Sequence, residues 1–172
     1  MTDIIAPDRM SHEKIKEILI DANVKAEFNG DTDGFVTVTG PSGFASFITI
    51  SDEHMLIKYE AVFEFREHGG IGERLELVNK LNEMVVFSRF LIPFDDDKMY
   101  SDYYISYEEG ITSKQIINSM CWFDNVTWNA IATLDESNLV KVGEKSKTSS
   151  TEHFVIYAIF FIVCIIFLAS YY

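Results

Sequence analysis

Acidic residues gather in two turns of the sequence, and carboxylates at such spacing can bind a divalent cation. The run from Asn29 to Gly34 follows the first half of a calcium-binding loop, N-x-D-x-D-G. That loop requires a bidentate glutamate at its twelfth position, where this chain has Gly40. The second run, Asp95 to Asp97, is contiguous, and adjacent side chains rarely converge on one ion without other ligands. We therefore interpret both runs as solvated turns.

Histidine, cysteine and serine are present without the spacing that metal binding or nucleophilic catalysis requires. The four histidines are dispersed along the chain, and no second cysteine or histidine lies near Cys121 in the sequence. No serine sits in a G-x-S-x-G elbow, since the segment from Gly40 to Phe44 is a turn between predicted strands. The glycines before Ile71 lack the lysine of a Walker loop. We expect a non-enzyme without catalytic residues, metal or cofactor.

One group of residues remains, on a helix predicted from Ser113 to Leu134. A helical projection places Trp122 about 120° from the mean direction of the apolar stripe. Three asparagines surround it in that projection: Asn118, Asn125 and Asn129. A large aromatic side chain among asparagines is typical of a surface that contacts a protein partner. The alternative is that Trp122 packs under the strand loops or the linker, and the sequence leaves both interpretations open.

The charge of the chain excludes some classes of partner. Asp and Glu number 27 against 14 Lys and Arg, which gives a formal net charge of -13. A nucleic-acid backbone would be repelled by this charge, and so would anionic lipid headgroups. Partners with basic or apolar surfaces are favoured.

The first half of the chain predicts a helix followed by an antiparallel meander. Ser11 begins a helix that ends near Asn23, with apolar residues at helical spacing. Four short segments rich in aromatic and branched residues follow it, separated by turn residues: Val24–Phe28, Phe35–Thr39, Phe44–Ile50 and Met55–Phe63.

The second half predicts two further helices with two strands between them. A helix follows the glycines, and its apolar stripe is Ile71, Leu75, Val78, Leu81 and Val85. The strands are Val85–Ile92 and Met99–Tyr107. Thr112 and Gln115 form a capping box for the last helix, whose stripe is Ile116, Met120, Phe123, Thr127, Ala130 and Leu134. The fold class is α+β, an antiparallel sheet with three packed helices in the order α-β-β-β-β-α-β-β-α.

The end of the sequence predicts a tether and a membrane anchor. Residues 1–134 form the α+β domain, and residues 135–152 form a flexible linker of polar composition. Residues 153–172 are the transmembrane tail anchor, because Phe154 to Tyr172 is uncharged and spans roughly 28 Å as a helix. We expect a single-pass membrane protein with a cytoplasmic N-terminal domain.

A family resemblance rests on dispersed motifs in the second half of the chain. They are the helix segment L-E-L-V-N-K-L-N from Leu75 to Asn82, the following V-V-F-S-R-F-L-I-P, the acidic turn at Asp95–Asp97, Tyr103–Tyr107, and G-I-T-S-K-Q from Gly110 to Gln115. With the order of elements, these motifs resemble the YbjN-like domain family, whose fold is shared with type III secretion chaperones. Asn79 and Asn82 match that family's paired asparagines. The resemblance covers about residues 10 to 134.

The resemblance implies a protein-binding or chaperone-like module, here tethered to the cytoplasmic face of a membrane. Its partner would be a protein or client, and a homodimer is left open. The alternative is a subunit of a membrane assembly or regulatory complex that is recruited through its transmembrane helix.

Overall fold

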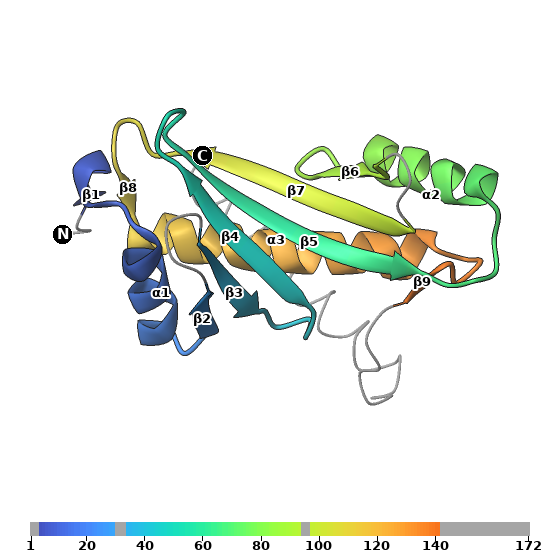
Figure 1. Cartoon of the computed structure of the whole chain (residues 1–172), viewed down its shortest axis with the longest axis horizontal. Coiled ribbons are helices and arrows are strands. Elements are labelled where there is room, and N and C mark those ends of the chain that lie inside the picture. Colours follow the sequence, from blue (N-terminus) through green and yellow to red (C-terminus); the bar gives the residue numbers. More distant parts are fainter. Residues whose placement is uncertain (1–3, 30–33, 94–96, 142–172) are drawn as a thin grey trace, which may run out of the picture. The chain divides into compact units, whose positions relative to one another are not determined.

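The computed structural model of this chain describes residues 4–29, 34–93 and 97–141. These residues form an α+β fold in which three α-helices pack against an antiparallel sheet (Figure 1). The expected order of helix, four strands, helix, two strands and helix is confirmed.

The main sheet has seven strands, and every pairing in it is antiparallel. The strands are β2 (Lys25–Asn29), β3 (Phe35–Thr39), β4 (Ala45–Ser51), β5 (Leu56–Phe65), β6 (Arg89–Leu91), β7 (Lys98–Ser106) and β9 (Val140–Lys141). The spatial order is β2-β3-β4-β5-β7-β6, and β9 pairs with the end of β5. A separate pair consists of β1 (Ile4–Ile5) and β8 (Ile111–Thr112), and a short 3-10 helix, η1 (Pro7–Arg9), follows β1.

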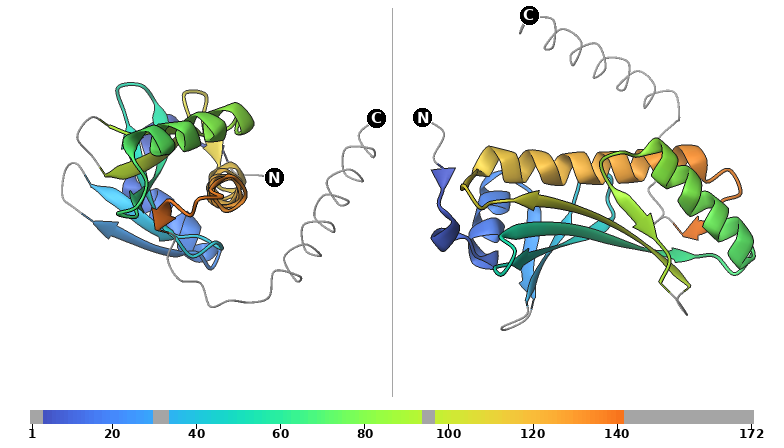
Figure 2. Two further views of the ribbon diagram at one scale, coloured as in Figure 1. Left: turned by 90° about the vertical axis from the view of Figure 1, so that its right-hand side faces the viewer. Right: turned by 90° about the horizontal axis from the view of Figure 1, so that it is seen from above.

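The helices are α1 (His12–Asp21), α2 (Ile71–Met84) and α3 (Ser113–Leu134). Figure 2 shows α3 as one long helix crossing a face of the sheet, with α2 beside its C-terminal half. The predicted caps of α1 and α3 are confirmed. Ser11 Oγ accepts a hydrogen bond from Lys14 N at 3.1 Å, and Gln115 N donates to Thr112 Oγ1 while Gln115 Oε1 accepts from Thr112 N.

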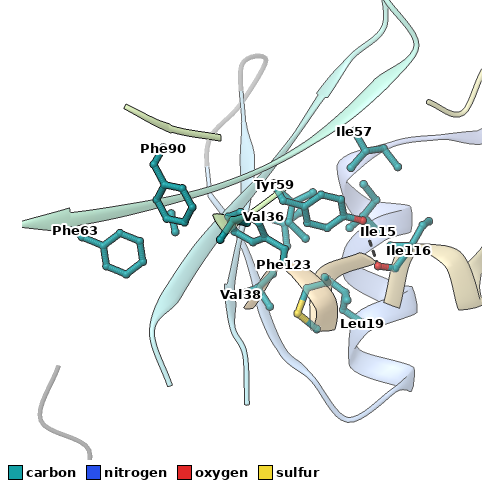
Figure 3. Packing of buried hydrophobic residues seen from close by; sticks show 14 of the residues in the cluster. Ile15, Leu19, Val36, Val38, Ile57, Tyr59, Phe63, Phe90, Ile116 and Phe123 are labelled. Carbon is teal, nitrogen blue, oxygen red and sulfur yellow. Dashed lines mark hydrogen bonds between the residues drawn. The ribbon is translucent and has the colours of Figure 1, made fainter. Parts of the chain in front are cut away.

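The core lies between α1, α3 and the sheet. Alternate residues of β5 are buried there, as period-2 alternation requires, and Figure 3 shows their packing. Tyr59 is fully buried, and its hydroxyl donates a hydrogen bond to the Ile116 carbonyl of α3 at 3.2 Å. Burial raises the pKa of Tyr59 far above its ordinary value, so the phenol remains a donor. This bond ties the long helix to the central strand.

The structure corrects the predicted face of α2. Ile71 and Leu75 are 61% and 47% exposed, whereas Leu77 is buried beside Val78 and Leu81. Arg74 is the reason, because its guanidinium stacks over the Phe65 ring at 4.9 Å and bonds to the Arg66 carbonyl and the Asp97 carboxylate. A stacked arginine therefore lies where the apolar period predicted leucine.

Three other expectations also differ from the structure. The strand predicted from Val85 to Ile92 is limited to Arg89–Leu91. On α3, Ala130 and Leu134 are only half-buried, and Asp124 and Ile131 are buried in addition to the expected residues.

The folded domain continues past Leu134, where the sequence predicted the start of the linker. Leu139 and Val140 are buried, and both backbone N–H groups donate to the Asp135 carboxylate, at 2.7 and 2.8 Å. The segment after Leu134 is mostly polar, so its composition predicted a linker. Its apolar residues Leu139 and Val140 are nevertheless buried and held by Asp135. The rest of the predicted linker and the predicted anchor lie outside the described residues. Across residues 4–29, 34–93 and 97–141, no helix combines the length and the apolar character needed to cross a membrane.

The corrected face of α2 predicts different effects for two neighbouring leucines. Leu77→Ala should lower the free energy of unfolding by about 2–5 kcal/mol, because it leaves a cavity at a buried site. Leu75→Ala, the same substitution at an exposed site, should change it by less than about 1 kcal/mol. Urea unfolding of both variants measures the difference. Equal losses would contradict the orientation of α2.

Candidate functional site

An exposed aromatic side chain projects from the middle of α3. Trp122 is 54% exposed, and its ring centroid lies 6.1 Å from that of Phe87 in the connection between α2 and β6. Phe87 stacks on Tyr103 of β7 at 3.9 Å, and Tyr103 stacks on buried Tyr59 at 6.0 Å. A continuous series of rings therefore joins Trp122 at the surface to the core.

The other predicted site residues lie around Trp122 on α3. Asn118 and Asn125 are exposed, and Asn129 is half-buried. Asn125 donates a hydrogen bond to the Cys121 carbonyl at 2.8 Å, so its side chain lies along the helix. We call Trp122, Asn118, Asn125, Val86 and Phe87 the Trp122 surface.

Sequence reasoning missed Val86 and Phe87. Val86 is fully exposed and Phe87 half-buried, although both were assigned to a strand. Three apolar residues in a row after a helix, V-V-F, were a signal, since a half-buried strand would alternate.

A shallow open groove runs beside Phe87, between the α2–β6 connection and β7. The residues that form it include Asn82, Val86, Phe87, Arg89, Tyr103 and Tyr104. Its wall is held by Asn82, whose amide bonds both the N–H and the carbonyl of Phe90 at 2.8 Å. The connection that carries Phe87 is thus pinned just after it.

A chain of buried hydroxyls also fixes this connection. Ser88 Oγ lies 2.7 Å from Ser101 Oγ of β7 and donates to the Asp102 carbonyl at 3.1 Å. Ser101 Oγ in turn lies 3.4 Å from Thr127 Oγ1 of α3. The α2–β6 connection, β7 and α3 are therefore joined by buried polar contacts.

The rotation of α3 is set by a buried carboxylate on its opposite side. Asp124 is fully buried and accepts hydrogen bonds from the backbone N–H of Ser42, at 2.8 Å, and from the Ser42 hydroxyl. Gly40 makes this approach possible, because a Cβ there would lie 2.2 Å from Asp124 Oδ1. Two residues along an α-helix differ by about 200°, so holding Asp124 inward directs Trp122 outward.

Carboxylates on the uncovered face of the sheet are matched by cations. Glu60 and Asp102 are directly opposite each other on β5 and β7. Arg89 donates to both oxygens of Asp102, at 3.1 and 2.6 Å, and Lys58 pairs with Glu60. Burial acts to lower the pKa of Lys58, but the hydrogen bond and the charge of Glu60 outweigh burial and raise it. Both cations are thus engaged by neighbouring carboxylates.

The fold defines a small α+β domain, and its candidate contact residues lie on one long helix and one short connection. The chain belongs to the YbjN family, because the family model described as "Putative bacterial sensory transduction regulator" matches residues 11–127. The resemblance seen in the sequence is confirmed for this domain.

One solved structure shows the same fold. It is the crystal structure of YbjN from E. coli, described as "a putative transcription regulator", with a TM-score of 0.63 and 15% sequence identity. The match covers 81% of this chain and 99% of that chain. No curated protein matches this chain.

The surface position of Trp122 predicts a small cost when it is truncated. Trp122→Ala removes one aromatic contact and should lower the free energy of unfolding by about 1 kcal/mol. Phe123→Ala, at the adjacent and fully buried position, should lower it by about 3–5 kcal/mol. Thermal melts of the two variants compare them directly. A loss for Trp122→Ala as large as that for Phe123→Ala would show that Trp122 belongs to the core.

Proposed function

We propose that this chain is a non-enzymatic, regulatory or chaperone-like module that binds a protein partner through the Trp122 surface. The observation that carries the proposal is an exposed tryptophan supported by rings that reach the core. Tryptophan is prominent among the residues that dominate binding energy in protein interfaces.

The Trp122 surface is built for binding at low conformational cost. Phe87 is fixed by its stack on Tyr103, and the following serine is held by the Ser101 hydroxyl and the Asp102 carbonyl of β7. Trp122 has only two side-chain torsions to restrict, and it already contacts Phe87. A partner would therefore meet an aromatic platform that needs little reorganisation.

The charge of the chain supports a protein as the partner. The descriptions of the family and of the E. coli protein both refer to regulation. A formal charge of -13 opposes contact with a nucleic-acid backbone and attracts basic protein surfaces. Regulation by protein contact fits this charge better than contact with DNA.

We also propose that residues 153–172 anchor the chain in a membrane and leave the α+β domain in the cytoplasm. The uncharged run from Phe154 to Tyr172 supports this, since it has the length and composition of one span. The tether would keep the domain near the membrane, so the domain would bind its partner there.

Partner binding can be tested with the full chain. A photo-crosslinking residue at position 118, beside Trp122, should capture a discrete protein in cells, and adding Trp122→Ala should remove that product. Aromatic anchors of this kind contribute ~2 kcal/mol or more, which is about a thirtyfold loss of affinity. Ile20→Ala is the matched control, because Ile20 is also half-exposed but lies on α1. Unchanged cross-linking in folded Trp122→Ala would refute the proposal.

Membrane anchoring makes a separate prediction. The full chain should sediment with membranes and resist extraction by carbonate or high salt, since an apolar span is held by burial in hydrocarbon. Removing residues 153–172 should release a soluble, folded, acidic protein. Insolubility or loss of the folded circular dichroism spectrum on truncation would instead assign the apolar run to the core.

A further inference from the structure

The main sheet has a partly uncovered edge at β7. This strand has nine residues, but β6 has three and pairs only with Tyr100, Ser101 and Asp102. Beyond that point, along Tyr103–Ser106, no described strand lies on the β6 side of β7. Figure 1 shows β7 continuing well past β6.

Two hydrogen bonds determine which backbone groups face this open edge. Tyr107 N donates to the Met55 carbonyl at 2.9 Å, in register with the β5–β7 pairing, so odd-numbered residues of β7 bond toward β5. The Asp102 carbonyl accepts from Ser88 Oγ, so even-numbered residues face the β6 side. Because directions alternate along a strand, the N–H and C=O groups of Tyr104 and Ser106 point outward at the open edge.

The described chain covers this edge in part, through the stack of Phe87 on Tyr103. Neither proline nor lysine occurs from Tyr103 to Ser106, and no backbone hydrogen bond from the 85–88 connection reaches Tyr104 or Ser106. The open groove described above runs along the same edge and includes Tyr103 and Tyr104.

We propose that a partner protein contributes an extended peptide that pairs with this edge of β7, in line with β6 and antiparallel to β7. Its backbone would bond the outward groups of Tyr104 and Ser106, as in strand addition to other sheets. This inference rests on the proposed function and specifies the form in which the partner binds.

The two faces of the sheet define the side chains that the peptide needs. On the helix side its residues meet Phe87, Tyr103 and the Trp122 ring, so these positions should be apolar. On the uncovered side they meet Tyr104, Ser106 and the exposed part of Arg89, so these positions should be polar. The peptide should therefore alternate apolar and polar residues.

Charge defines the end of the peptide that lies beyond Ser106. Glu108 and Glu109 follow β7 after Tyr107, and neither has an ion-pair partner in the described part of the chain. The nearby cations Lys58 and Arg89 already pair with Glu60 and Asp102. In the antiparallel direction the N-terminal end of the peptide reaches these glutamates, so it should be basic.

The test uses the full chain in detergent and a fluorescent peptide, Lys-Lys-Val-Thr-Val-Thr-Val. Ser106→Pro removes an N–H that points outward, so no hydrogen bond to β5 is lost. Proline is tolerated where a strand edge faces solvent. It should weaken peptide binding about fivefold to tenfold. Ser106→Ala is the matched control, since it removes the same side-chain oxygen that accepts from Glu108 N but keeps the backbone N–H. Its affinity should equal that of the wild type.

The peptide backbone offers a second variable that does not depend on protein folding. N-methylation of alternate amides should abolish binding for the set that faces β7 and leave the other set unaffected. Equal affinity of Ser106→Pro and Ser106→Ala, or equal effects of the two methylated sets, would overturn strand addition.

Failure of this inference can be separated from failure of the proposed function. If Trp122→Ala loses the cross-linked partner while Ser106→Pro keeps it, the Trp122 surface binds a partner but strand addition is wrong. If neither substitution affects the cross-link, the proposed function is wrong as well. Loss of both the peptide and the cross-linked partner in Ser106→Pro, with Ser106→Ala unaffected, supports the full proposal.

Discussion

The placement of α3 depends on one buried carboxylate. Asp124 lies between the long helix and the β3–β4 turn, where it accepts both polar hydrogens of Ser42. A carboxyl group away from water is tolerated only when such partners replace its hydration. The requirement is geometric as well as energetic, because the turn must approach closely enough that only glycine fits at position 40. Because an α-helix is regular, this contact also sets the direction in which the remaining side chains of α3 point.

The opposite side of α3 is organised by weaker contacts acting together. Neutral hydroxyls join the helix to β7 and to the α2–β6 connection, and the Asn82 amide closes that connection against β6. None of these bonds is strong alone, since a neutral hydrogen bond contributes about 1 kcal/mol net. Together they restrict the short segment that presents Phe87. Phe87 is therefore held in place although it lies in a connection between two elements.

Local signals in the sequence accounted for much of this fold. The capping box at Thr112 and Gln115 and the apolar period of the last helix gave its bounds, and the same projection placed Trp122 away from the core. Features that depend on long-range packing were not predictable. Arg74 takes a core-side position because Phe65 and Asp97 lie nearby in space, and the period of α2 alone favoured Leu75. The contact of Phe87 with Trp122 and the unequal lengths of β6 and β7 likewise arise only when distant segments meet.

The way in which the described chain ends has a mechanical consequence. After α3 the chain reverses at Asp135, whose carboxylate holds the N–H groups of Leu139 and Val140, and β9 then pairs with the end of β5. A pulling force applied beyond Lys141 would act on the Asp135 hydrogen bonds and the β5–β9 pairing before it acted on the helix. The pairing of β9 with β5 and the hydrogen bonds to Asp135 would break before the contacts of α3. Tension on the chain could then rise and fall without turning the long helix or displacing the rings that it supports.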